Sequence, residues 1–544
     1  MDRRSFLTAW MKSPSSTFNH PQSFNSHSRP LSSGLEAWVP TTTDPWDNVR
    51  AGHLLRRTMM MPKWKEITKI AAMTPSDAVD LLLNTPSNPA EPSMANHGTT
   101  SLKGLDTVLT EQMKGIWKGD DAILKTWFAN VLLNPLNLPL SIIEKMTFFW
   151  SGHFTSQFDA SDTFVIAPLL YRQNELFRNM GNSAIWDFKA LAFNITLDGA
   201  MLVYLGGDVN MYKPPVPPST TPPPPNENYS RELMELFTLG FGSGYQEGDI
   251  KEGARILTGW HSAQYTDEAT PNGLFNTYFT PFDHDTGNKN YLNTQFSAIT
   301  ANDNTQDLVK KNEIQKMIDA VFAFNPQALA TFICRKIYKF FIYSDTAAVD
   351  ETVVSAMAAL FIQNNFDIKP VMRTLLKSAH FFDNMNIGCQ IKTPAEYIIG
   401  IARQLGYTVS MADNMTTILQ EMFNPPNVSG WTGWHDWITT NTYPVRSTIV
   451  AKAIAGMSDQ NVLDFINQFS KPTDANQLIT DLGALMLPRK LAQARHDDLV
   501  TQLVGGPAMD YEWPGILSSS PATAALKMRL VLTTICNLPD YQLC

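Results

Sequence analysis

The sequence contains few cysteines and few charged residues. Four cysteines occur in 544 residues, and no two form a Cys-x-x-Cys pair, which excludes a disulfide-dense scaffold. Charged residues make up 17% of the chain, below the average of about 25%. The net charge is −9 and no stripe of Lys and Arg is present, so we expect no nucleic-acid partner.

Long apolar runs are also missing. No run reaches the roughly 18 residues of a membrane helix, so we expect no transmembrane segment. The chain lacks the zinc motif HExxH, the nucleophile motif GxSxG, a Walker loop, and a GxGxxG after a strand. Apolar residues are nevertheless 44% of the chain and aromatic residues 11%, which indicates a folded globular protein of one large domain or several ordinary ones.

Residues 1–45 are rich in Ser, Pro and Asn and predict an N-terminal arm that is disordered or lies on the surface. The arm begins with Arg3-Arg4 followed by Phe6-Leu7, a pattern similar to a twin-arginine export signal. The residues that follow are polar, whereas an export signal needs an apolar segment. The arginine pair is therefore either a relic or part of a weak signal.

Hydrophobic periodicity and capping residues predict a mainly α fold: one large multi-helix domain over residues 46–544 with a small β-hairpin insert. Thr74 and Pro75 are a helix start, as N-cap and first helical residue. Cys334 is predicted to be buried, and the last residue, Cys544, to be exposed. A Pro-rich loop is expected at 212–226, and a hairpin at about 274–293 that turns at 286–288. The other predicted helices are at about 120–133, 139–151, 164–180, 184–196, 305–323, 326–343, 350–364, 367–378, 392–405 and 413–422.

Residues 226–260 concentrate charge just after the Pro-rich loop. Glu227, Arg231 and Glu235 have i, i+4, i+8 spacing and share one helix face, with Glu232 about 100° away from Arg231. One interpretation is a solvated ladder of ion pairs, with acids favoured at a helix N-terminus. The other is a carboxylate cluster for acid–base or metal chemistry, in which Arg231 holds a carboxylate or an anionic substrate.

Two further features concern aromatic and imidazole side chains. His153 and His284 stand in distinctive contexts, WSGHF and FDHDTGNK, although a lone histidine is more often a hydrogen-bonded structural residue. Residues 427–437 place three tryptophans within seven positions and include Trp434 and His435. This loop either stacks on sugar rings or is anchored to the core by its aromatic side chains.

The motifs together resemble the bacterial proteins catalogued as domain of unknown function 1800. The resemblance spans about residues 50–540 and rests on AGHLLRRT, FWSGHF, PNENYSRELMELFTLG, YQEGDIKEGARILTGW, HDTGNK and NPPNVSGWTGW. It implies a mainly helical fold and no settled biochemical role. Relatives are often encoded beside an exported protein similar to a sulfatase or alkaline phosphatase, which implies such a partner. The resemblance also implies a periplasmic or extracellular location. The alternative is a cytoplasmic location, which is expected if the arginine pair is a relic.

The first functional hypothesis is a hydrolase or metal-assisted enzyme that acts on an extracytoplasmic polymer or its fragments. It predicts that its site residues converge in one pocket, with a divalent metal as an optional cofactor. The expected catalytic residues are Glu232, Glu235, His153 and His284, and the expected substrate-binding residues are Arg231, Glu227, Trp260, Trp434 and His435.

The second hypothesis is a non-catalytic binding or assembly protein that partners the sulfatase-like protein or a surface glycan. It predicts that the charged cluster is a closed ion-pair network, and that the Pro-rich and tryptophan loops form an exposed apolar patch. A third hypothesis is a metal or redox protein with Glu and His ligands in a helical bundle, although the usual Glu-x-x-His pair is missing.

Overall fold

The computed structural model describes residues 34–84, 86–94, 110–133, 140–158, 165–178, 186–215, 222–263, 276–406, 410–506 and 510–544. Over these ranges helices dominate, and the β-structure is two antiparallel two-stranded sheets. The predicted mainly α class with a small β insert is therefore confirmed. The twin-arginine-like start lies outside the described residues.

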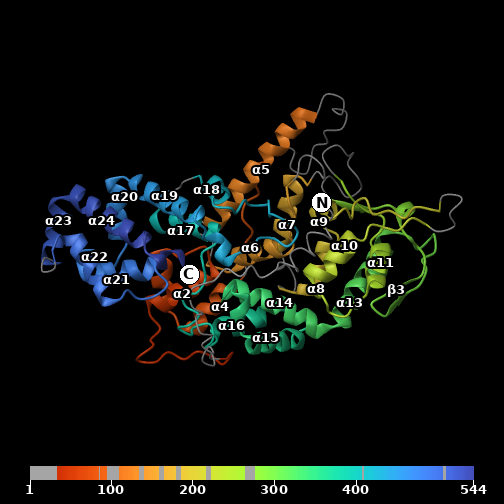
Figure 1. Cartoon of the computed structure of the whole chain (residues 1–544), viewed down its shortest axis with the longest axis horizontal. Helices are drawn as coiled ribbons and strands as arrows, with labels where there is room; N and C mark the ends of the chain where they lie inside the picture. The colour runs from red at the N-terminus through yellow and green to blue at the C-terminus, as the bar shows by residue number, and fades with distance from the viewer. Residues whose placement is uncertain are drawn as a thin grey trace, which may run out of the picture.

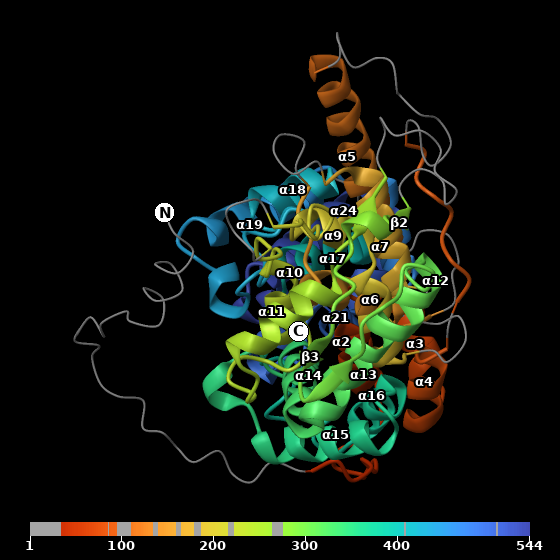
Figure 2. The same cartoon turned by 90° about the vertical axis from the view of Figure 1, so that its right-hand side faces the viewer.

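The helices form an elongated assembly (Figure 1). Helices α8–α11 (residues 188–256) and α13 (Gln315–Phe324) lie at one end with strand β3 (Lys289–Tyr291), and α20–α24 (residues 459–536) lie at the other. Helix α5 projects from the rest in both views (Figures 1 and 2). The helices of the first half are α2 (Asn48–Thr58), α3 (Trp64–Ala71), α4 (Pro75–Leu82), α5 (Thr110–Leu133), α6 (Ile143–His153), α7 (Ala167–Arg178), α8 (Phe188–Thr196) and α9 (Gly199–Tyr204).

Helix starts follow the capping residues in the sequence. The Thr74 hydroxyl accepts a hydrogen bond from the Asp77 backbone N–H, and Pro75 is the first residue of α4, as predicted. Helix α14 begins in the same way, with Asn325 as N-cap and Pro326 first. Helix α6, predicted at about 139–151, is buried over most of its length.

Residues 228–256 fold as two short helical segments and a longer helix. The first helix passes without a break into a π-helix, in which each turn holds one extra residue. π-Helices are rare and occur frequently at functional sites. These elements are α10 (Asn228–Glu232), the π-helix η1 (Leu233–Phe237) and α11 (Glu247–Ile256).

The β-structure differs from the predicted hairpin. Strand β2 pairs with β1, and β3 pairs with β4, so the strands of 274–293 do not pair with each other across 286–288. The hairpin turn is at Leu292 and Asn293, which both have positive φ, 47° and 61°, as a two-residue hairpin turn of this class requires. The strands are β1 (Trp260–Ser262), β2 (Thr277–Phe279), β3 (Lys289–Tyr291) and β4 (Thr294–Phe296).

Helices return after β4 close to their predicted positions, except that the helix predicted at 413–422 begins at Met411 and ends at Thr417. They are α12 (Gln306–Val309), the π-helix η3 (Lys310–Ile314), α13 (Gln315–Phe324), α14 (Pro326–Phe341), α15 (Glu351–Gln363), α16 (Ile368–Lys377), α17 (Pro394–Leu405) and α18 (Met411–Thr417). The last group is α19 (Thr442–Ala455), α20 (Asp459–Asn467), α21 (Ala475–Met486), α22 (Gln493–Val504), α23 (Trp513–Ser519) and α24 (Pro521–Cys536). Short 3-10 turns lie at Pro281–Asp283, Thr346–Ala348, Trp434–Trp437, Asp510–Glu512 and Pro539–Gln542.

One large hydrophobic core contains side chains from Ala51 to Tyr541, and a smaller one joins α5, α7 and α9. Cys334 is buried as predicted, but the prediction that Cys544 is exposed is wrong. Its backbone N–H donates to the Gln390 carbonyl, and Leu543 forms a bridge with Ile391, which places the end of the chain inside the core. The domain boundaries stay a prediction.

None of the described helices is by itself long and apolar enough to cross a membrane. Residues Gln306–Phe324 and Pro326–Phe341 meet the length and composition criteria only as a pair, and the two helices are bent by 88°.

Candidate functional site

A pocket of about 290 Å³ lies where the C-terminal end of α6 meets α14, the start of α17 and the tryptophan loop. Its titratable lining residues are His153, Lys336, Lys339 and Glu396. The aromatic lining residues are Phe148, Phe149, Phe340, Trp431, Trp434 and Trp437. The pocket therefore combines an aromatic wall with a small group of ionisable side chains, which is the usual composition of a ligand site.

The tryptophan loop contacts α6 through a glycine. Gly430 has φ of +80°, and a Cβ built there would lie 2.7 Å from the Gly152 carbonyl oxygen. The Thr155 hydroxyl donates to the Val428 carbonyl and fastens the loop to the residues that follow α6. Close backbone approach at a left-handed position admits only glycine. The loop therefore needs Gly430 to place its tryptophans beside His153.

The tryptophans of the loop differ in burial. Trp437 is 6% exposed and anchors the loop to the protein, whereas Trp431 and Trp434 are half-buried on the pocket wall. His435 is exposed and stacks on Trp434, with ring centroids 3.5 Å apart. His435 therefore supports the Trp434 ring and is not itself a pocket-lining residue.

His153 and Lys336 form a direct contact in this pocket. The Nζ atom of Lys336 is 3.0 Å from Nδ1 of His153, and Nε2 of His153 is 3.0 Å from the Phe237 carbonyl oxygen. A carbonyl oxygen can only accept, so Nε2 carries the ring hydrogen and Nδ1 is the acceptor that faces Lys336. His153 is thereby held as a neutral imidazole with a fixed tautomer.

The electrostatics of the pair follow from burial. Burial, with a smaller contribution from the charge of Lys339, lowers the pKa of Lys336 to about 7. Burial and then the charge of Lys336 lower the pKa of His153 well below its ordinary value, against the opposing effect of the Phe237 carbonyl. An amine with a pKa near neutrality is poised to take up and release protons.

The charged motif PNENYSRELMELFTLG contributes backbone carbonyl groups to this site. Lys336 Nζ donates to the Leu236 carbonyl at 3.1 Å, and His153 to that of Phe237. Both carbonyls lie at the end of the π-helix η1, where the wider turn leaves carbonyl groups without their usual partners. Residues 226–240 therefore hold the Lys336–His153 pair in place.

Glu396 is the carboxylate on the pocket wall. It is buried, forms an ion pair with Lys145, and accepts a hydrogen bond from the Thr393 backbone N–H at 2.7 Å. Burial alone would raise the pKa of Glu396, but the Lys145 ammonium and the Thr393 N–H hold it below its ordinary value. This carboxylate is thus already neutralised by a structural partner.

The acidic and basic side chains of α10 and η1 form the ladder that one interpretation predicted. Arg231 contacts Glu227 at 3.2 Å, Glu235 at 3.4 Å and both oxygens of Glu247 at 3.0 and 2.8 Å. Burial raises the pKa of Glu235, and the charge of Arg231 opposes this. None of these side chains, nor Glu232, lines the pocket of His153 and Trp434.

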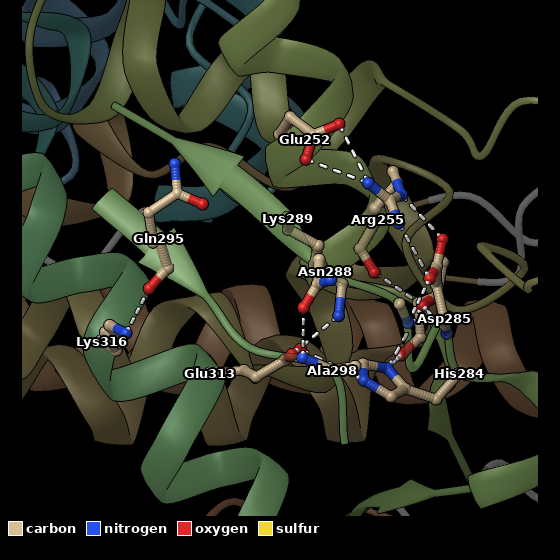
Figure 3. A network of polar contacts seen from close by, with 12 residues as sticks. Glu252, Arg255, His284, Asp285, Asn288, Lys289, Gln295, Ala298, Glu313 and Lys316 are labelled. Carbon is tan, nitrogen blue, oxygen red and sulfur yellow. Dashed lines mark hydrogen bonds and ion pairs between the residues drawn. The ribbon is translucent and has the colours of Figure 1, made fainter. Parts of the chain in front are cut away.

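His284 belongs to a different cluster, built around the HDTGNK motif (Figure 3). Its Nδ1 faces the Thr258 carbonyl at 2.9 Å, and its Nε2 lies 3.1 Å from Glu313 Oε2 without the alignment of a hydrogen bond. The other Glu313 oxygen accepts from Lys289 Nζ at 2.7 Å. All three side chains are buried, and Glu313 lies in the second π-helix, η3.

Trp260 is also away from the pocket. It is 1% exposed and packs against Phe279 in the sheet of β1 and β2. Of the nine predicted site residues, the pocket thus includes His153 and Trp434, with His435 behind Trp434. The ladder of Glu227, Arg231 and Glu235, the His284 cluster and Trp260 lie elsewhere because their partners are different elements.

Sequence reasoning missed Lys336, although a signal was present. Phe332, Lys336 and Phe340 have i, i+4, i+8 spacing on α14, so a lysine interrupts an aromatic stripe of an otherwise well-patterned helix. A cation on a half-buried stripe needs partners. Its partners, His153 and Leu236, come from distant segments that the pattern of α14 cannot identify.

Among the residues that the structure describes, no group of three or more His, Cys, Asp or Glu side chains is arranged to hold a metal ion. The divalent metal considered from the sequence therefore stays a prediction without an assigned ligand set.

Comparison with known families gives one result. The model of the family described as "Protein of unknown function (DUF1800)" matches residues 53–543. No curated protein and no solved structure matches the chain.

Proposed function

The chain belongs to the DUF1800 family, and from the geometry of its pocket we propose that it is an enzyme that acts by proton transfer on a saccharide unit of an extracytoplasmic polymer or its fragments. The observation that carries the proposal is the contact of 3.0 Å between Lys336 Nζ and His153 Nδ1 on the wall of the pocket. A lysine held there with a pKa near neutrality has the property of a general base.

The aromatic wall supports a saccharide as the ligand. The half-buried rings of Trp431 and Trp434 offer flat apolar surfaces that suit the C–H faces of a sugar. The volume of about 290 Å³ is at the lower end of ligand pockets, which span about 300–1,000 Å³. A pocket of this size favours a single ring of a longer chain.

The proton-transfer role falls on Lys336 rather than on the carboxylates expected from the sequence. Glycoside hydrolysis generally uses two carboxyl groups that flank the scissile bond. The lining carboxylate Glu396 is paired with Lys145, and Glu232 and Glu235 do not line the pocket. A hydrolase with these glutamates as acid and base has less support from this geometry than an amine-based mechanism.

A second candidate is a non-catalytic binding or assembly protein, and the closed ion-pair network around Arg231 favours it. In this case the tryptophan pocket would bind a surface glycan, or the chain would bind a sulfatase-like or alkaline-phosphatase-like protein. Lys336 and His153 would then only shape the pocket.

The two candidates differ in turnover. Purified protein would be screened on an array of bacterial and plant polysaccharide fragments, and each ligand bound would be incubated with the protein and followed by mass spectrometry. The enzyme proposal expects a bound glycan to be converted, and Lys336→Met to bind it without conversion. Lys452→Met, which removes an exposed lysine of α19, is the matched control. Binding without conversion by the unaltered protein would reject the enzyme and leave the binding candidate.

An extracytoplasmic location belongs to the proposal and is supported by the arginine pair and the family resemblance. Expression of the full chain with a C-terminal tag, followed by fractionation, tests it. Recovery with cytoplasmic markers, and no change on replacing Arg3 and Arg4 by Lys, would contradict export by this route.

A further inference from the structure

We propose that the substrate unit is an acidic sugar, a uronate within a polysaccharide, and that the reaction is β-elimination, with Lys336 as the base at C5 and Lys339 as the group that holds the uronate carboxylate. This inference names the substrate class and the reaction of the site above, so it rests on the proposed function.

The charges on the pocket wall carry the first step. Lys336 and Lys339 are three residues apart on α14, so both project from the same face. In the described part of the chain neither forms an ion pair with a carboxylate: Lys336 contacts His153 and Leu236, and Lys339 Nζ donates to the Thr346 hydroxyl at 2.9 Å. Asp345 does not line the pocket, and its charge only opposes the lowering of the pKa of Lys339 by burial.

Among the described residues that line the pocket, no unpaired carboxylate balances Lys339, the cation that remains when Lys336 is in its neutral form. Glu396 is matched by Lys145. The pocket thus presents excess positive charge beside its tryptophans, and its complement is a sugar ring that bears an anion.

Among sugar anions, the carboxylate of a uronate also allows an amine to act as the base, because it makes the neighbouring C–H bond easier to deprotonate. The hydrogen on C5 of a uronate is adjacent to the carboxylate, so a base can remove it while the developing negative charge spreads onto the carboxylate oxygens. A cation at that carboxylate stabilises the charge where it develops. Lys339 is suited to this role because it lines the pocket, and because its ammonium donates one hydrogen bond to the Thr346 hydroxyl and has further N–H groups to offer a ligand.

The step balances without a co-reactant. Lys336 Nζ takes the proton from C5, the electron pair of that C–H bond forms the C4=C5 double bond, and the bond from C4 to the glycosidic oxygen breaks. The leaving oxygen takes up one proton from solvent, and the Lys336 ammonium releases to solvent the proton that it gained, so the base is restored. No water is added, no group is oxidised, and the product is a 4,5-unsaturated uronate at the new end of the chain.

Three neighbours prepare the amine for this role. In the neutral form, its two N–H groups are satisfied by His153 Nδ1 and by the Leu236 carbonyl, so its lone pair is left to accept the proton. The Phe332 ring, whose centroid is 4.7 Å from Nζ, stabilises the ammonium that forms. His153 is a positioning residue, since its other nitrogen is tied to Phe237.

The test uses the full chain with a panel of polysaccharides and two readouts. The panel holds polyuronates, their methyl esters, neutral polymers of the same linkage, and sulfated neutral polymers. Ultraviolet absorbance reports the unsaturated product, and mass spectrometry reports whether the fragments gained water. We expect absorbance to rise with at least one polyuronate, and the masses of the two fragments to add up to that of the substrate without an added water.

Variants assign the two lysines. Lys336→Met and Lys336→Arg should both lower kcat by at least about 100-fold, because arginine keeps the charge but does not release its proton at accessible pH. Lys339→Met should mainly raise KM for the free uronate, and much less for the methyl ester. His153→Gln should shift the pH at which the activity reaches half of its maximum, and Lys452→Met should match the unaltered protein. Circular dichroism checks that each variant is folded.

The outcomes separate this inference from the proposed function. Cleavage of a polyuronate with a gain of water and no absorbance would overturn β-elimination and keep a saccharide enzyme. If only neutral or sulfated polymers are converted, the proposal that the substrate is a uronate is overturned, and the pocket is kept as the site. Full activity of Lys336→Arg would overturn the role of the lysine as base. If the protein neither binds nor converts any polymer of the panel, both proposals are overturned.

Discussion

The Nδ1 atom of His153 lies 3.0 Å from the Nζ atom of Lys336, across 183 positions of the sequence. This contact joins the last residue of α6 to the middle of α14, and both side chains are held by carbonyls of the π-helix η1. Two sequence motifs that look independent, FWSGHF and PNENYSRELMELFTLG, are therefore parts of one site with a lysine that lies outside both.

Replacing Lys336 by Met is predicted to remove a pH dependence of stability. Burial lowers the pKa of Lys336 in the folded protein to about 7, whereas the ordinary value is 10.5. Between these values the unfolded chain binds a proton that the folded chain does not, so the contribution of Lys336 to stability rises with pH across this window. Urea denaturation from about pH 6 to about pH 10 should show a flatter profile for Lys336→Met, with its largest relative stabilisation at low pH. If the variant and the unaltered protein show the same slope of stability against pH, the burial of the Lys336 amine is contradicted.

Replacing Trp434 by Ala is predicted to weaken ligand binding while leaving the fold intact. The ring lies on the pocket wall, is supported by His435 and contacts Tyr343 edge-on. We expect the Kd for a bound glycan to rise at least about ten-fold, which is about 1.4 kcal/mol. Isothermal titration calorimetry measures the change. Tyr511→Ala, at an aromatic residue that is 73% exposed, should bind as well as the unaltered protein.

Gly430→Ala is predicted to destabilise the protein and to distort the pocket. The added Cβ would meet the Gly152 carbonyl at 2.7 Å and occupy a left-handed backbone position. A strained position of this kind costs about 1–3 kcal/mol. Gly248→Ala is the matched control, because its Cβ in helix α11 would contact nothing within 4 Å and alanine favours a helix. Thermal unfolding should rank Gly430→Ala below the control, and equal melting temperatures would disagree with the close approach.

Glu396→Gln is predicted to be strongly destabilising because it leaves Lys145 buried without its partner. Breaking a buried ion pair in this way costs about 3–5 kcal/mol. Because the folded-state pKa of Glu396 is held below its ordinary value, its stabilisation is complete above the ordinary pKa and is lost as the pH falls through the folded-state value. Chemical denaturation of Glu396→Gln and of the double variant Lys145→Met, Glu396→Leu should show that the double variant recovers much of the loss.

Arg231→Met is predicted to have a small effect, in spite of the place of Arg231 in the family motif. The side chain pairs with Glu227, Glu235 and Glu247 near the surface, where such pairs contribute about 1 kcal/mol or less. Stability should fall by no more than that, and binding in the tryptophan pocket should be unchanged. A large loss of turnover at full ligand affinity would contradict this prediction and indicate a catalytic role for Arg231, which the sequence predicts only as a substrate-binding residue.

The parts of the fold that depend on neighbouring residues were predictable. Thr74 and Pro75 start α4 because a cap and a first-turn proline act within one turn of helix. The burial of α6 follows from its nearly continuous apolar sequence. The hairpin was placed at the wrong turn because Thr286-Gly287-Asn288 has turn-forming residues, whereas Leu292 and Asn293 make the turn with little local signal.

The site was predictable only in part. His153 and Trp434 were singled out by their motifs, and the structure brings both to one pocket. Glu232 and Glu235 were singled out by charge, but their motif contributes the carbonyls of Leu236 and Phe237 to the site. Every residue has a carbonyl group, so no residue type reveals that contribution.

The sequence by itself determined the helical class, most helix positions and the family, because these depend on periodicity, capping and motif order along the chain. Only the tertiary structure decided which charges are paired and which are desolvated. Arg231 has three carboxylates around it and lies near the surface, whereas Lys336 is enclosed by Phe332, His153 and the end of η1. The protonation of a side chain depends on its solvent and its neighbours in space, and those are fixed only when distant segments pack together.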